Sequence, residues 1–236
     1  MIYLNNYGWN DKLSQLKQES TYNALTHGRI SIVHRTCYEV VSENGLFQCE
    51  LTGNMMYGKS DFELPCTGDW VLFQPFDEHK GIIVDMLPRE RTLYRKKNGT
   101  VADKQAIASY VDKAFIVQSL DDNFNVRRAE RFMVQMQEEN INPVLVFNKA
   151  DLGFDEQKVE EQIRHIARQI PVFFTSIHQP QTILQLRESI SAGETVVFVG
   201  SSGVGKSSLV NALCEKSVLL TSDISLSTGK GRHTST

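Results

Sequence analysis

Residues 196–213 read VVFVGSSGVGKSSLVNAL, and the rest of the chain is best interpreted outward from this stretch. Four apolar residues, Val196–Val199, predict a buried strand. The next eight, Gly200–Ser207, fit the pattern G-x-x-x-x-G-K-[ST], and apolar residues then recur at helical spacing as far as Leu213. A strand, a glycine-rich turn and a helix in this order are typical of a phosphate-binding loop.

Each residue type in this loop has a chemical reason. Glycine lets the backbone N–H groups turn inward around phosphate oxygens, and the following helix presents its N-terminal N–H groups to the same anion. Lys206 is predicted to reach the β- and γ-phosphates and Ser207 to bind Mg²⁺, so both are candidate catalytic residues. The predicted phosphate-binding set is Gly200, Ser201, Ser202, Gly203, Val204, Gly205, Lys206, Ser207 and Ser208.

A second motif identifies the base. The apolar run Val144–Phe147 predicts a strand, and it ends in Asn148, Lys149, Ala150 and Asp151, which fit N-K-x-D. Ligands of open α/β sheets bind beyond the carboxyl ends of the strands. The Asp151 carboxylate can accept from both N1–H and the exocyclic amine of guanine, a pair that adenine does not offer. GTP and GDP are therefore the predicted ligands, and an ATP-using kinase is disfavoured.

A third candidate segment for the base also follows a predicted strand. Thr175 and Ser176 lie where GTPases place a short motif whose backbone touches guanine, although Ile177 is larger than the usual next residue.

Composition limits the possible partners. The net charge of −3 over 236 residues gives no general attraction to nucleic acid, so RNA contact must come from local patches. No apolar run approaches the length of a membrane span, and the first residues lack the features of a signal peptide, so no membrane partner is expected. The four cysteines lie far apart, which favours reduced thiols and a cytoplasmic protein.

The pattern of apolar and polar residues divides the chain into segments. Residues 1–27 are polar and are interpreted as an extension. Residues 28–88 alternate short apolar runs with turns, including Glu43–Gly45, and predict a small closed barrel, either an OB-like or an SH3-like one. The predicted barrel strands are Arg29–His34, Tyr38–Ser42, Leu46–Thr52, Asp69–Gln74 and Gly81–Leu87.

Residues 89–104 form a predicted basic linker. Its first part holds Arg89, Arg91, Arg95 and two lysines against a single acid, with Tyr94 among them. This composition fits a nucleic-acid contact beside the barrel, and it fits a solvated linker equally well.

Residues 105–236 alternate strands with amphipathic helices, which predicts a parallel sheet with helices on both faces. Here the base-reading motif precedes the phosphate loop, whereas an ordinary GTPase has the reverse order. The fold class is therefore α/β plus β: an OB-like barrel followed by a circularly permuted GTPase domain.

These motifs together resemble one family. Pro65–Val71 (PCTGDWV) in the barrel, NKAD before GSSGVGKSS, and the later GKGRHTST are similar to the RsgA (YjeQ) GTPases over residues 28–236. In this comparison Tyr110 departs from an asparagine. The resemblance implies late maturation of the small (30S) ribosomal subunit, GTPase activity stimulated by that subunit, and rRNA contact through the barrel. We expect a monomer. An RNA-binding module with a nucleotide-sensing, weakly hydrolysing domain remains the alternative.

The last residues resemble the switch I loop of the family. Thr234 is the predicted second Mg²⁺ ligand, although Ser235 fits nearly as well, and His233 is a further catalytic candidate that also fits a plain loop histidine. The resemblance implies a D-x-P-G switch II motif and a zinc module beyond Thr236, and Zn²⁺ is expected only there. We therefore expect this chain to be a fragment that binds guanine nucleotide poorly and hydrolyses GTP slowly.

Overall fold

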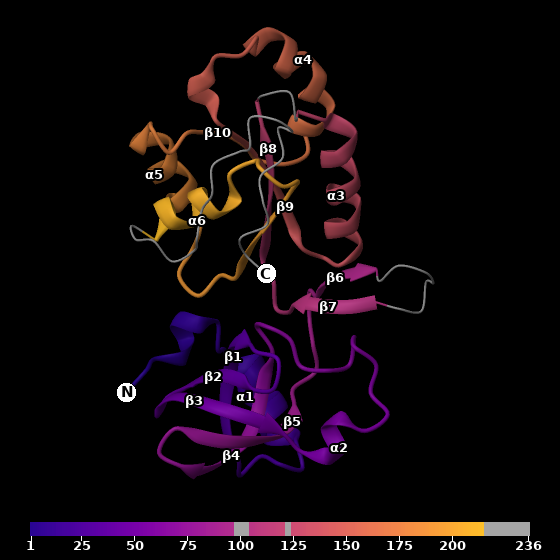
Figure 1. The fold of residues 1–236 in the computed structure, drawn as a ribbon, viewed down its shortest axis with the longest axis vertical. Coiled ribbons are helices and arrows are strands. Elements are labelled where there is room, and N and C mark those ends of the chain that lie inside the picture. The colour runs from indigo at the N-terminus through magenta and orange to yellow at the C-terminus, as the bar shows by residue number, and fades with distance from the viewer. Residues whose placement is uncertain (97–103, 121–123, 215–236) are drawn as a thin grey trace. The chain divides into compact units, whose positions relative to one another are not determined.

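A computed structural model describes residues 1–96, 104–120 and 124–214 of the chain. The chain forms two compact units (Figure 1). The first holds Met1–Asp112 together with Ala192–Thr195, and the second holds Lys113–Ser191 and the chain from Val196 onward. Within the described residues, no helix has the length and apolar character that crossing a membrane requires.

The first unit is built on a closed barrel with strand order β1-β2-β3-β5-β4. Strands β3 and β5 run parallel and the other pairs antiparallel. This is the order of an OB-fold, and it differs from the antiparallel meander of an SH3-like barrel. All five predicted strands are confirmed: β1 Thr26–Val33, β2 Tyr38–Ser42, β3 Gly45–Leu51, β4 Trp70–Asp77 and β5 Lys80–Met86.

Strand alternation fills the barrel interior. In β3, Phe47 and Cys49 are buried while Gln48 and Glu50 are exposed, because successive side chains point to opposite faces of a strand. Ser42 pairs with Gly45, so the predicted turn is confirmed as a two-residue hairpin connection. The interior cluster contains Ile30, Val40, Phe47, Cys49, Val71, Phe73 and Ile83.

The N-terminal residues are more than an extension. A 3-10 helix η1 (Leu4–Tyr7) and helix α1 (Asp11–Glu19) precede the barrel. Leu4 and Leu13 are buried in one cluster with Trp70 of β4. Ile2, Trp9 and Leu16 pack against the same cluster, so a segment of polar overall composition is anchored by a few apolar side chains.

The described residues of the predicted basic linker, 89–96 and 104, belong to the first unit. Arg89 donates to Asp69 through Nε (2.9 Å to Oδ1) and Nη2 (2.6 Å to Oδ2), and Asp69 is fully buried. Arg89 also donates to the carbonyls of Phe62 and Leu64. Since its donors are bound to protein acceptors, Arg89 fits neither a nucleic-acid contact nor a solvated linker.

Two strands and a short helix complete this unit. Strands β6 (Leu93–Lys96) and β7 (Lys104–Ala108) form an antiparallel pair, so the predicted linker contains a strand. Helix α2 (Gly53–Met56) follows β3.

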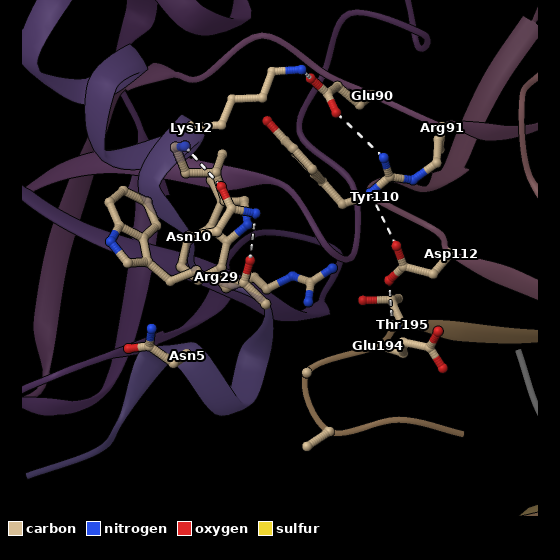
Figure 2. Close-up of a pocket in the computed structure, with 16 residues that line it drawn as sticks. Asn5, Asn10, Lys12, Arg29, Glu90, Arg91, Tyr110, Asp112, Glu194 and Thr195 are labelled. Atoms are coloured by element: carbon tan, nitrogen blue, oxygen red, sulfur yellow. Dashed lines mark hydrogen bonds and ion pairs between the residues drawn. The ribbon is translucent and has the colours of Figure 1, made fainter. Parts of the chain in front are cut away.

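A chain of ion pairs lines a cavity of about 500 Å³ in the first unit (Figure 2). Lys12 pairs with Glu90, Glu90 with Arg91, and Arg91 Nη2 lies 3.1 Å from Asp112 Oδ1. Asp112 also exchanges two hydrogen bonds of 2.8 Å with the backbone of Thr195. Residues 192–195 are thereby bound to this unit although they follow helix α5 (Pro180–Glu188) in the chain.

Tyr110 has an unusual backbone for its residue type. Its φ of 53° lies in the left-handed region, which asparagine tolerates far better than a bulky aromatic residue. The ring is buried, and the hydroxyl donates to the carbonyl of Pro88. These contacts hold the tyrosine in this left-handed conformation.

The second unit is a four-stranded parallel sheet with order β10-β9-β8-β11. Alternate side chains pack against α3 and α4 on one face and α5 and α6 on the other, which confirms the predicted architecture (Figure 1). Asn125 caps α3 and Asp155 caps α4 through their side chains. The strands are β8 Lys113–Ser119, β9 Asn142–Asn148, β10 Val172–Thr175 and β11 Val196–Val199, and the helices are α3 Val126–Glu138, α4 Glu156–Ala167, α5 Pro180–Glu188 and α6 Lys206–Leu213.

Replacing Arg89 by glutamine should destabilise the first unit by about 3–5 kcal/mol, because the buried Asp69 carboxylate would lose its cationic partner. Urea unfolding followed by tryptophan fluorescence measures this, since both tryptophans, Trp9 and Trp70, lie in this unit. Arg95→Gln is the matched control, because Arg95 is exposed and bonds only the side chain of Gln105 among the contacts described. Equal midpoints for the two variants would show that the Arg89 contacts contribute little.

Candidate functional site

The predicted motifs meet at one edge of the parallel sheet. Asn148 ends β9 and residues 149–151 follow it, Thr175 ends β10 and Ser176 follows it, and Gly200–Ser208 follow β11 and open α6. Because all four strands are parallel, their carboxyl ends lie at the same edge, where open α/β sheets bind ligands.

The phosphate loop has the backbone that its glycines predict. Gly200, Gly203 and Gly205 have φ values of 152°, 83° and 93°. A Cβ at Gly200 would lie 2.4 Å from the Val117 carbonyl oxygen, and one at Gly205 would lie 2.2 Å from Asn148 Nδ2. Glycine is therefore required at both positions by conformation and by space.

Lys206 begins helix α6 and folds back over the loop. Its Nζ donates to the carbonyls of Gly200 (3.1 Å) and Ser201 (2.8 Å). An ammonium has three N–H donors, so one remains for a ligand. Burial lowers the pKa of Lys206 because its charge is incompletely solvated. An anion bound at the loop would offset this desolvation.

Asn148 connects the three loops. Its side chain is almost fully buried, and Nδ2 donates to the Val204 carbonyl at 2.9 Å. Its Oδ1 accepts from the hydroxyl of Thr175 at 3.3 Å. A single amide side chain therefore fixes the loop after β9 against both the phosphate loop and the end of β10.

Asp151 is presented to solvent as an ionised carboxylate. A hydrogen bond from the Ser176 side chain lowers the pKa of Asp151. The neighbouring Lys149 has a left-handed backbone with φ of 64°. Such strained positions persist only where surrounding contacts enforce them, and they cluster at ligand sites.

The Ser176 segment is partly committed to protein contacts. Its amide donates to the Thr182 hydroxyl of α5 at 3.0 Å, and its hydroxyl accepts from the His178 amide at 3.0 Å. A backbone contact with a base from this segment would therefore come from the amide of Ile177 rather than that of Ser176.

Ser207, the predicted Mg²⁺ ligand, is the second residue of α6 beside Lys206. Thr234, Ser235 and His233 lie outside the described residues. Across residues 1–96, 104–120 and 124–214, no cluster of three or more His, Cys, Asp or Glu side chains could hold a metal ion.

Sequence reasoning missed Arg128 of α3, whose Nη1 donates to Ser201 Oγ at 3.0 Å. The position of α3 in the sheet topology could have indicated this contact. Helix α3 leaves the carboxyl end of β8, and β8 is the sheet neighbour of β11, so an arginine in the first turn of α3 can reach the loop that follows β11.

Replacing Asn148 by alanine should weaken binding of Mg²⁺–GDP by at least about tenfold, because the buried Val204 carbonyl would lose its partner. Fluorescence titration with a labelled GDP measures the affinity. Asn142→Ala is the control, since Asn142 is exposed at the opposite end of the same strand. An unchanged affinity in Asn148→Ala would show that the loops hold their places without this amide.

The comparisons with known proteins agree with this geometry. A sequence model of the RsgA GTPase family matches residues 86–236. A Bacteroides thetaiotaomicron protein named small ribosomal subunit biogenesis GTPase RsgA 1 is 76% identical over 98% of this chain, and a Methanosarcina acetivorans protein named small ribosomal subunit biogenesis GTPase RsgA is 36% identical over 97%.

Solved structures are similar as well. The crystal structure of YjeQ from Thermotoga maritima matches with a TM-score of 0.63 and 27% identity over 80% of this chain and 64% of that one. YloQ, described as a circularly permuted GTPase, matches in fold with a TM-score of 0.58 and 23% identity over 82% of this chain and 66% of that one. The chain spans 65% and 61% of the lengths of the Bacteroides and Methanosarcina proteins. On the family match and these identities, the chain belongs to the RsgA GTPase family.

Proposed function

We propose that this chain binds and hydrolyses GTP and acts in the maturation of the small ribosomal subunit. The observation that carries the proposal is the hydrogen bond from Asn148 to Val204, because it joins a guanine-reading loop to a phosphate loop. Two motifs that are separate in the sequence are thereby held against each other. The names of the relatives support the choice of the small subunit as partner.

Guanine selection rests on Asp151. Its carboxylate would accept from N1–H and the exocyclic amine of guanine, and the Ile177 amide would donate to the base oxygen. Adenine would leave the carboxylate unpaired, and such mismatches discriminate by several kcal/mol, on the order of 10⁴-fold.

Hydrolysis would depend mainly on positioning and charge. Lys206 would direct its remaining N–H at the β- and γ-phosphates, while the loop amides and the start of α6 would bind their oxygens. The Ser207 hydroxyl fits a Mg²⁺ site because it stands beside Lys206 at the start of α6, and Thr234 is the proposed second ligand. Bound Mg²⁺ supplies neutralisation of phosphate charge. His233 is proposed as an assisting residue.

The barrel is the proposed rRNA contact. OB-folds bind nucleic acid with the loops after their first and fourth strands. Here these loops and their flanks present exposed Arg35, Phe76, His79 and Lys80, and Phe76 supplies a stacking surface. Asp77 and Glu78 are exposed in the same segment, so this surface carries charges of both signs. We propose that the protein works as a monomer in the cytoplasm, and that any zinc module lies outside these residues.

Replacing Asp151 by asparagine should lower GDP affinity by at least about 100-fold and raise affinity for xanthosine diphosphate, because an amide can donate to the 2-oxo group of xanthine. Competition binding with GDP and xanthosine diphosphate measures this change in base preference. Asp155→Asn is the matched control, since asparagine caps a helix as well as aspartate does. An unchanged base preference in Asp151→Asn would refute the assignment of the guanine reader.

GTP hydrolysis by this chain alone should be slow. GTP hydrolysis by the 76%-identical Bacteroides relative should become faster when purified small ribosomal subunits are added. Phosphate release measured for both proteins, with and without subunits, tests this. Lys206→Ala and its counterpart in the relative should abolish the stimulated rate. Subunit binding without any stimulation would favour the alternative function, an RNA-binding module with a nucleotide-sensing domain.

A further inference from the structure

Arg128 of α3, which belongs to neither of the predicted motifs, contacts the phosphate loop. Its Nη1 lies 3.0 Å from Ser201 Oγ, and the interaction is partly buried. Its backbone N–H is held by the capping side chain of Asn125 at 3.0 Å. The residue is therefore fixed at its backbone, and its side chain spans from α3 to the loop.

Ser201 receives hydrogen bonds from two cationic side chains. Its hydroxyl accepts from Arg128, and its carbonyl accepts from Lys206 at 2.8 Å. A change in the orientation of Ser201 would move the carbonyl that directs the Lys206 ammonium. Arg128 is thus coupled to the phosphate-binding lysine through one residue.

The charge of Arg128 is poorly placed for helix stability. Helix α3 has no acidic residue in its first turn, while Arg127 and Arg128 both lie there. Cations at a helix N-terminus oppose the helix dipole. Arg127 lies with Arg131 and Val134 along a separate exposed hollow, so Arg128 alone of this pair is directed to the phosphate loop. An anion at the loop would compensate the unfavourable charge.

We propose that Arg128 is a positioning residue of the phosphate site. It holds Ser201 so that the Ser201 carbonyl orients Lys206, and it places a second positive charge beside the terminal phosphates. This inference rests on the proposed guanine-nucleotide function and adds a residue that neither the phosphate-loop motif nor the base-reading motif contains.

The test compares nucleotides that differ only in phosphate number. Affinities for Mg²⁺ complexes of GMP, GDP and GTP are measured for the wild-type chain and for Arg128→Gln, Arg128→Lys, Ser201→Ala and the Arg128→Gln/Ser201→Ala double variant. Arg127→Gln is the matched control, because it removes the same charge from the adjacent residue of the same helix. Thermal unfolding of each variant reports any general loss of structure.

Arg128→Gln should weaken GDP and GTP binding by about tenfold, the effect expected for a lost charged hydrogen bond, and GMP binding by less than about twofold. Arg128→Lys should keep most of the affinity, since a lysine retains the positive charge and N–H donors for the Ser201 hydroxyl. The double variant should bind GDP and GTP as tightly as whichever single variant binds them less tightly, because the two substitutions remove the same contact.

Equal losses for GMP and GDP would show a merely structural role and overturn the inference. Additive losses in the double variant, or an equal effect of Arg127→Gln, would overturn it too. Failure of the wild-type chain to bind any of the three nucleotides would instead refute the proposed function. The two failures are thus distinguished by the wild-type titration.

Discussion

The proposed nucleotide site depends on one buried amide, the side chain of Asn148. It donates to the Val204 carbonyl and accepts from Thr175, so three loops from three strands share one side chain. A buried amide has few alternative partners, and leaving the Val204 carbonyl unpaired would be expensive. Gly205 must lack a side chain for this contact to exist, since a Cβ there would lie 2.2 Å from the amide nitrogen. The glycine pattern of the phosphate loop is therefore explained partly by the base-reading loop.

The same contact explains how a permuted chain can bring the loops of the proposed nucleotide site together. What binding requires is that the loops after β9, β10 and β11 lie at the carboxyl edge of one parallel sheet. That requirement constrains which strands are neighbours in the sheet. It does not constrain the order of the strands along the chain. The central strand β8 pairs with both β9 and β11, so the base-reading and phosphate loops are held one strand apart.

In the first unit two carboxylates have the corresponding role, Asp69, which is buried, and Asp112, which is half-buried. Asp69 binds Arg89 and the Cys66 amide, and Asp112 binds Arg91 and the backbone of Thr195. Because of these contacts, Arg89 and Arg91, which the sequence places in a predicted basic linker, belong to the folded first unit. Ion pairs of this kind leave no periodic pattern in the sequence. The two charged residues of each pair lie far apart along the chain, and each one by itself is indistinguishable from a charged surface residue.

The sequence by itself determined the barrel strands, the alternation of the second unit, and the two motifs with their permuted order. These features are encoded locally, in strand period, helix period and fixed spacing, so neighbouring residues suffice to read them. Only the tertiary structure decided that residues 4 and 13 anchor the N-terminus in the core, that Arg89 is buried against Asp69, and that Arg128 reaches the phosphate loop. Each of these joins residues far apart in the chain, and their pairing depends on which surfaces the folded elements bring within contact distance.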